Sequence, residues 1–285
     1  MRTLLLLFLV PLSAAAAAPD DVARILITGF EPFGGRAQNH SFEIARALER
    51  SPGLVAAGVE VTACLLPVDY DRGAEVAKRC FENLRGKPAL VLSLGEGDCS
   101  LRIETAATNL DDTSVPDNSG VLRENRVIDP SLPPRVGLSL AVDRMYCVRP
   151  PSRAPFRASV SPGFYVCNNT AFHLAHFFAA RGIPYGFIHV PPSDCGSMSD
   201  VARNARTLGI LLSGALAFGS VGPQEAYPLP HPALPGNRWA TDLAGNRALI
   251  SRAEAAPVPA CTLDFLARLS ERYEAGPLSK IIYLW

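Results

Sequence analysis

The segment GFYVCNNTAFH, residues 163 to 173, places Cys167 between an aromatic-aliphatic run and a stretch with a helical pattern. A thiolate there would be a nucleophile for acyl transfer. A helix N-terminus and a neighbouring imidazolium lower a thiol pKa from about 8.5 to about 7 or below. Taken alone, a cysteine of this kind is more often a buried small side chain or half of a disulfide.

Two further side chains have types that could serve a thiol nucleophile. His189 lies near the end of the apolar run GFIHVP, and Glu104 lies in LRIETAATN. A histidine in such a run is, by itself, more often a satisfied core residue, and the glutamate could be a solvated strand residue. The Gly-rich segment GFEPFGG lacks the GK[ST] of a phosphate loop, so we discard nucleotide binding.

The first 18 residues have the three parts of a secretory signal peptide. A basic start is followed by an apolar stretch from Leu4 to Leu12 and a run of alanines. The apolar stretch is too short to span a bilayer, and no later segment is apolar for long enough. We expect a mature protein that begins at Ala17 or Ala18, is exported to the periplasm or secreted, and has no membrane partner. The alternative is an uncleaved interfacial anchor.

Export changes how the seven cysteines are interpreted, because an oxidising compartment pairs thiols. Seven is odd, and we expect Cys167 to be the thiol left free. The other six could form three bridges with 15 connectivities; they are Cys64, Cys80, Cys99, Cys147, Cys195 and Cys261. No CxxC pair occurs, so neither a structural zinc nor any other metal or cofactor is expected.

Composition narrows the class of partner. The 285 residues are 48% hydrophobic and 19% charged, as in a globular protein with a full core. Lys and Arg total 27, and so do Asp and Glu, so no net field favours nucleic acid or an anionic membrane. We expect a small or peptide-sized substrate.

The elements that must position these side chains follow from periodicity. Apolar, β-branched runs predict strands at 23–30, 59–67, 88–95 and 183–191, and helical spacing predicts helices at 41–50, 71–84 and 168–182. This alternation predicts an α/β protein, a three-layer α/β/α sandwich with a mostly parallel central sheet. The segments GFEPFGG and GEGDC, together with His189 and Cys167, would then share the rim at the carboxyl ends of the strands.

Four motifs occur in one order: TGFEPFGG, ETAATNLDDTSVPDN, YVCNN and GFIHVP. Between Ile25 and Phe218 the chain thereby resembles the pyroglutamyl peptidase I family, cysteine peptidases that remove an N-terminal pyroglutamyl residue. The resemblance implies the same sandwich fold. It also implies Cys167 as nucleophile, His189 as base and Glu104 as the residue that orients the base.

The resemblance also implies a substrate pocket. A pyroglutamyl group is an uncharged lactam, which calls for apolar walls with one donor and one acceptor. The positions that match family pocket residues, or stand in their place, are Phe30, Phe33, Asn39, Glu96, Val115 and Tyr165.

Several positions depart from the family pattern. The chain reads GEGDCS where G-Q-A-G-G-R is common, so that Glu96 replaces an amide, and it is about two residues shorter before Glu104. Ser114 stands where an Arg is usual, and His40 replaces a Pro. We therefore expect slower turnover than in a typical relative. A non-catalytic protein that binds a lactam or a blocked peptide end, and an amidase for another cyclic or acylated amine, stay open as alternatives.

The chain continues beyond the matched region. We expect a catalytic domain over 22–220 and an extension over 221–285, with a proline-rich connector at 222–237 and a helical pattern at 263–273. The tail IIYLW is apolar enough to dock. We interpret the extension as an appendage packed on the same domain, with a dimerisation arm, and hence a homo-oligomer, as the alternative.

Overall fold

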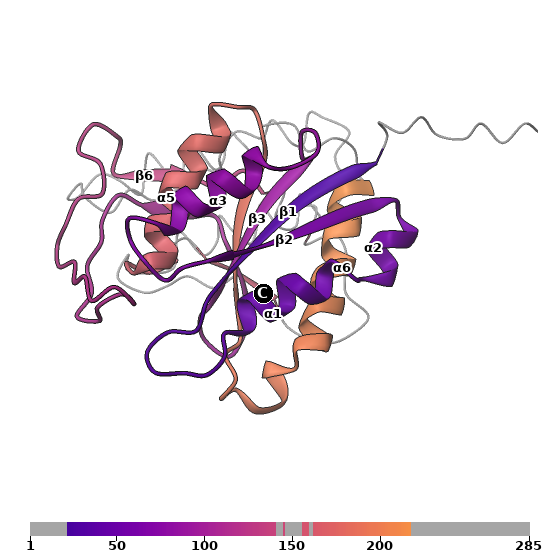
Figure 1. The fold of residues 1–285 in the computed structure, drawn as a ribbon, viewed down its shortest axis with the longest axis horizontal. Coiled ribbons are helices and arrows are strands. Elements are labelled where there is room, and N and C mark those ends of the chain that lie inside the picture. The colour runs from indigo at the N-terminus through magenta and orange to yellow at the C-terminus, as the bar shows by residue number, and fades with distance from the viewer. Residues whose placement is uncertain (1–21, 141–144, 146–155, 160–161, 218–285) are drawn as a thin grey trace, which may run out of the picture.

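The computed structural model describes residues 22–140, 145, 156–159 and 162–217, and in these a six-stranded sheet lies between two layers of helices (Figure 1). The strand order is β2-β1-β3-β8-β4-β7, and β5 and β6 form a separate pair. The strands are β1 (Ala23–Phe30), β2 (Val59–Leu66), β3 (Leu90–Glu96), β4 (Leu101–Glu104), β5 (Ala106–Thr108), β6 (Arg135–Gly137), β7 (Phe156–Ser159) and β8 (Tyr185–Val190). The helices are α1 (His40–Leu48), α2 (Pro52–Ala56), α3 (Gly73–Glu82), α5 (Val166–Ala179), α6 (Val201–Ala217) and the 3₁₀ turn η1 (Gly196–Ser199).

Both faces of the sheet are covered, which explains why its strands are nearly continuous apolar runs. Alternate side chains of β1 point to opposite layers: Ile25 and Ile27 belong to one core cluster, and Leu26 belongs to the other. The first cluster includes residues of α1 and α6, such as Ile44 and Leu208. The second lies beneath α3 and α5, so the predicted α/β/α sandwich is confirmed (Figure 1).

The four predicted strands match β1, β2, β3 and β8 within two residues at each end. In this part of the sheet all pairings are parallel. The sequence did not predict that β4 runs antiparallel to β8 and parallel to β7. Only four residues, 97–100, separate β3 from β4, which is too few for the crossover that a parallel strand needs.

The surroundings of Cys167 differ from the prediction. No strand leads into the cysteine: Gly163 adopts a φ of 85°, and α5 already begins at Val166. Cys167 is therefore in the first turn of the helix instead of preceding it. The short turn 162–165 contains a glycine whose positive φ a β-branched residue would not accept.

Two disulfides lie within the described residues. Cys64–Cys80 joins β2 to α3, and Cys99–Cys195 joins the β3–β4 loop to the segment after β8. Cys167 is free, whereas Cys147 and Cys261, like the expected signal peptide and extension, lie outside the described residues.

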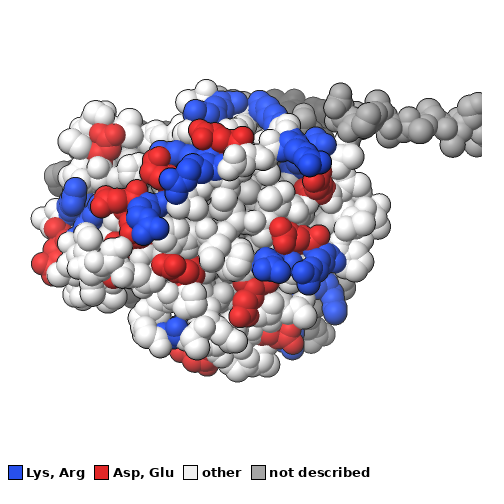
Figure 2. Space-filling model, in the orientation of Figure 1, with Lys and Arg blue, Asp and Glu red and all other residues white. Residues whose placement is uncertain are grey.

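The described surface has no single sign of charge. Figure 2 shows Lys and Arg interspersed with Asp and Glu over the face drawn, in line with the balanced composition. Among the described residues, no helix is both long and apolar enough to cross a membrane.

Candidate active site

The carboxyl ends of β1, β3 and β8 meet at one rim beside the N-terminus of α5, as predicted, and a cavity of about 220 Å³ opens there. Most of the predicted site residues line it: Phe30, Phe33, Asn39, Glu96, Tyr165, Cys167 and His189. Glu104 is fully buried behind His189. Further lining residues that sequence reasoning missed are Val68, Gly97, Arg102, Val166 and the turn 162–164.

Cys167 is the second residue of α5, and the N-cap residue Tyr165 makes no side-chain cap. The first backbone N–H groups of a helix have no partner within it, so they are available near the thiol. The strand β3 approaches the sulfur closely, since a Cβ on Gly95 would lie 2.9 Å from Cys167 Sγ. Glycine at position 95 is therefore required for this approach.

The two asparagines after the cysteine fix the start of α5. Asn168 accepts a hydrogen bond from Thr108 N at 2.8 Å and donates to Thr108 O at 2.8 Å and Leu110 O at 2.9 Å. Asn169 donates to the Asp111 carboxylate at 2.8 Å. The YVCNN motif thus ties the helix turn of Cys167 to the segment that follows Glu104.

His189 and Glu104 form a buried pair on neighbouring strands. The distance from His189 Nδ1 to Glu104 Oε1 is 2.8 Å, and the two side chains are 3% and 0% exposed. When Nδ1 carries the hydrogen and donates it to the carboxylate, Nε2 has a lone pair to accept a proton. Gly97 allows this packing, because a Cβ at that position would lie 2.8 Å from His189 Cβ.

Arg102 also belongs to this cluster. Its Nε donates to Glu104 Oε1 at 2.7 Å, its Nη1 donates to Asp98 Oδ2 at 3.1 Å, and its Nη2 lies 3.1 Å from His189 Nδ1. In register, Arg102 lies opposite His189 on the antiparallel pair β4–β8. The sequence signal was the spacing in LRIE, because residues two apart on a strand share a face.

The electrostatics of the thiol differ from the expectation. Burial, together with the nearby carboxylates of Glu104 and Glu96, raises the pKa of Cys167 to about 12, and Arg102 opposes this rise. The sequence had suggested a lowered value from the helix N-terminus. Here removal from water and two carboxylates outweigh that effect.

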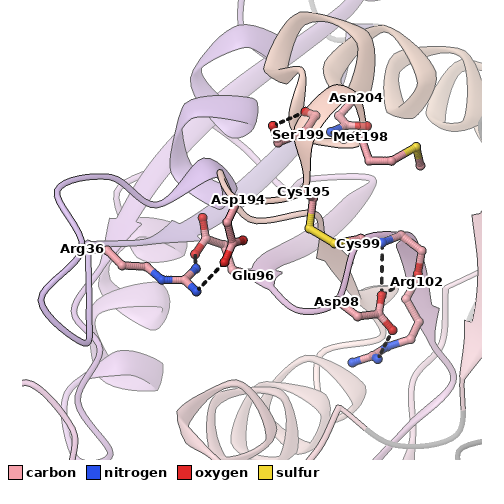
Figure 3. The surroundings of a disulfide bond; sticks show 12 residues. Arg36, Glu96, Asp98, Cys99, Arg102, Asp194, Cys195, Met198, Ser199 and Asn204 are labelled. Carbon is pink, nitrogen blue, oxygen red and sulfur yellow. Dashed lines mark hydrogen bonds and ion pairs between the residues drawn. A yellow bond between two sulfur atoms is a disulfide. The ribbon is translucent and has the colours of Figure 1, made fainter.

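Glu96 forms part of the cavity wall, and the charge of its carboxylate is compensated by neighbouring groups. Its side chain is 2% exposed, and it accepts hydrogen bonds from His40 N at 2.8 Å and Arg36 Nη1 at 3.1 Å. Arg36 also reaches Asp194 at 3.5 Å, so it links the β3–β4 side of the rim to the segment after β8 (Figure 3). The charge of Glu96 is therefore not left for a substrate to satisfy.

The GFEPFGG loop is held by side chains of the other motifs. Asn39 caps α1 by accepting from Ser41 N at 3.1 Å and donates to Glu31 O at 2.9 Å, so its amide shapes the loop. The Glu31 carboxylate accepts from Val68 N at 3.1 Å and from Asn118 at 2.9 Å. This explains why the first and second motifs occur together.

Tyr165 lies where the resemblance has Phe, and its hydroxyl donates to Pro116 O at 2.9 Å. Its ring packs against Phe33 and Tyr70, with centroids 6.1 and 5.7 Å away. Val115, which was also expected at the pocket, is 48% exposed and is not among the residues that line the cavity. The bond from Tyr165 fixes the loop at the following residue and leaves Val115 facing outward.

Among the described residues, no group of three or more His, Cys, Asp and Glu side chains is arranged to hold a metal ion. What the site offers chemically is a thiol, an imidazole with a carboxylate partner, a buried guanidinium and helix N–H groups. These are the parts of an acyl-transfer centre.

Comparisons with known proteins point to one family. A family model described as pyroglutamyl peptidase matches residues 23–202, which is more than half of the chain. A pyrrolidone-carboxylate peptidase of Pyrococcus furiosus is 32% identical over 170 residues, which cover 59% of this chain and 80% of the relative. A pyrrolidone-carboxylate peptidase of Levilactobacillus brevis is 34% identical over 172 residues, covering 59% and 81%.

Solved structures are similar over the same region. The pyrrolidone carboxyl peptidase of Thermococcus litoralis aligns with a TM-score of 0.60 and 27% identity, covering 69% of this chain and 94% of that one. A Bacillus amyloliquefaciens pyroglutamyl peptidase I aligns with a TM-score of 0.61 at 22% identity, covering 68% and 97%, and supports the fold.

Proposed function

Because this chain belongs to the pyroglutamyl peptidase family and is a cysteine-type exopeptidase, we propose that it hydrolyses the amide bond after an N-terminal pyroglutamyl residue. In this proposal Cys167 is the nucleophile, His189 the base and Glu104 the residue that orients the base. The observation that carries the proposal is the 2.8 Å contact between His189 Nδ1 and Glu104 Oε1, on a cavity that Cys167 also lines.

In the attack step the Cys167 proton passes to His189 Nε2 as the sulfur forms a bond to the pyroglutamyl carbonyl carbon. The carbonyl oxygen takes up the electron pair of the C=O π bond. Since burial raises the pKa of Cys167 to about 12, the resting thiol is neutral. Proton transfer to the imidazole therefore accompanies attack, with Glu104 stabilising the imidazolium.

The first turn of α5 supports this step. Its backbone N–H groups lie at the positive end of the helix, beside the thiol, where an oxyanion would develop. His189 then donates its proton to the leaving amine, and the C–N bond breaks. A water molecule, deprotonated by His189, hydrolyses the resulting thioester and returns the thiol.

The cavity fits an uncharged ring. Phe30, Phe33 and Val68 supply apolar walls, and Glu96 is neutralised by Arg36. The alternative of an amidase for a different amine depended on an unbalanced charge at position 96. With that charge paired, a five-membered lactam is the substrate we propose.

We also propose that the protein acts outside the cytoplasm, in the periplasm or as a secreted enzyme. Two disulfides within the described residues support this location, because such bonds persist in oxidising compartments. The pattern of residues 1–18 supports it independently.

A second candidate is a relative that binds a blocked peptide end without turning it over. The raised pKa of Cys167 favours it, since a neutral thiol is a poor nucleophile. Exposed Ser114, in place of an Arg, points the same way.

Turnover of a fluorogenic pyroglutamyl amide decides between the two candidates. Release of the fluorophore by wild-type protein, and none by Cys167→Ala, supports the peptidase. Binding of a pyroglutamyl peptide without release by the wild type supports the second candidate.

A further inference from the structure

The guanidinium of Arg102 lies inside the cluster of side chains that would do the chemistry. Its side chain is 9% exposed, and it contacts the carboxylates of Glu104 and Asp98 as well as the imidazole of His189. It also lines the cavity together with Cys167. A buried cation in such a place needs an explanation beyond packing, because burying charge costs free energy unless partners compensate it.

The contacts at His189 Nδ1 cannot both be hydrogen bonds. A ring nitrogen has either a hydrogen or a lone pair in the ring plane, so Nδ1 cannot donate to Glu104 and accept from Arg102 together. Glu104 Oε1 is the closer partner, at 2.8 Å against 3.1 Å. A lone pair facing a carboxylate oxygen at that distance would be repelled, whereas an N–H there makes a charge-assisted bond.

This choice of tautomer depends on an acceptor oxygen of Glu104 that is held in front of Nδ1. Its side chain is 0% exposed, and its Oε2 has no hydrogen-bond partner within the described part of the chain. The contacts of this carboxylate are made by Oε1, which accepts from Arg102 Nε at 2.7 Å and faces His189 Nδ1. The charge-assisted bond from Arg102 therefore fixes the oxygen that Nδ1 meets.

We propose that Arg102 is a positioning residue that fixes Glu104 Oε1 as a hydrogen-bond acceptor and thereby holds the hydrogen of His189 on Nδ1, leaving Nε2 to accept the Cys167 proton. The inference rests on the proposed triad. If Arg102 were replaced by a neutral residue, Glu104 Oε1 would no longer be fixed as an acceptor facing Nδ1. The ring hydrogen would then sit on Nε2, where it blocks the base.

The surroundings hold Arg102 in place. Asp98 accepts from Nη1 at 3.1 Å, and the neighbouring Cys99 is bonded to Cys195 (Figure 3). The disulfide thus fixes the loop that carries Asp98 to the segment that follows His189. Arg102 is connected on one side to the triad and on the other to this cross-linked loop.

The test is the tautomer of His189, read from imidazole ¹⁵N shifts of the full-length protein. The chain has 5 histidines, and the spectrum of His189→Gln assigns the relevant signals. In the wild type we expect the ¹⁵N shift of His189 Nε2 to be that of a ring nitrogen without a hydrogen. In Arg102→Gln we expect the pattern to reverse, with a kcat loss of roughly 100-fold or more and a smaller change in KM.

Two further variants separate positioning from a merely structural role. Arg102→Lys keeps the charge. It should retain the wild-type tautomer and recover most of the activity that Arg102→Gln loses. In a Glu104→Gln background, Arg102→Gln should cost little more, because residues that act through one another are not additive. Arg24→Gln is the matched control. Arg24 forms an ion pair with Glu60 at a distance of 3.2 Å and does not line the cavity, so kcat should not change.

An Arg102→Gln protein that folds, keeps the Nδ1–H tautomer and has kcat within about 3-fold of wild type would overturn the inference. Should that variant not fold, Arg102→Lys decides, and loss of its wild-type tautomer counts against the inference. Absence of wild-type turnover would instead remove the proposed function, while the tautomer measurement still reports on Arg102.

Discussion

At the scale of single residues, the site depends on glycines as much as on the groups that react. Gly95 and Gly97 lie on either side of Glu96, and a Cβ on either would come within 3 Å of Cys167 or His189. The GEG segment therefore lets the end of a strand pass close to Cys167 and His189, the proposed nucleophile and base.

Replacing Cys167 or His189 by Ala should each abolish nearly all turnover of a pyroglutamyl amide, because a nucleophile and its base act as one unit. Glu104→Gln should cost less, since both reacting groups remain. Steady-state kinetics of the three purified variants measure this order. Wild-type rates in Cys167→Ala would refute the mechanism.

The raised thiol pKa predicts how Cys167 reacts when its base is missing. In His189→Ala the proton has no acceptor, and a pKa near 12 leaves the thiol protonated at all pH values well below that. Alkylation by iodoacetamide should then climb steadily from pH 7 to 11 without a plateau. A plateau beginning near pH 8.5, the ordinary thiol value, would contradict the effect of burial.

At the scale of elements, long periodic segments were predictable and short ones were not. The apolar run of β1 fixed its bounds, and the end of β8 placed His189 at the rim. The four-residue β4 has no resolvable period, so its antiparallel direction and the role of Arg102 required tertiary structure. The outward position of Val115 likewise depends on a bond from Tyr165 to the next residue.

The two disulfides should differ in their effect on activity. Removing Cys99–Cys195 as a double Ser variant should lower the free energy of unfolding by about 4.7 kcal/mol and removing Cys64–Cys80 by about 3, by loop-closure entropy. Only the first should also reduce kcat, because it joins the loop of Asp98 to the segment after His189. Chemical denaturation and kinetics of both variants check this, and equal kinetic losses would contradict it.

At the scale of the whole molecule, the sequence predicts an N-terminal leader before the matched domain and a long extension after it. Sequence patterns alone speak for the leader and the extension, because both lie outside the described residues. Their roles are best tested on the intact and the shortened protein.

A chain that ends at Gly219 should melt at a lower temperature and yet turn over substrate, because the extension has apolar and proline-rich character but no acid-base cluster. Thermal unfolding and turnover of the shortened protein measure the two effects. If the protein shortened after Gly219 folds but is completely inactive, the extension shapes the site.

The exported protein should lack its first 16 or 17 residues and contain one reactive thiol, Cys167. Intact mass and thiol counts, taken with and without denaturant and reductant, give both numbers. Retention of Met1, or several free thiols, would contradict the proposed compartment.

The bond between Cys99 and Cys195 closes a covalent ring of the chain. Glu104, Cys167 and His189 all lie between these two cysteines, which are 96 residues apart. A single proteolytic nick anywhere inside the ring would therefore leave both fragments attached, with all three residues on one molecule. In the proposed extracellular location, such a cut would leave a two-chain form whose fragments separate on reducing gels.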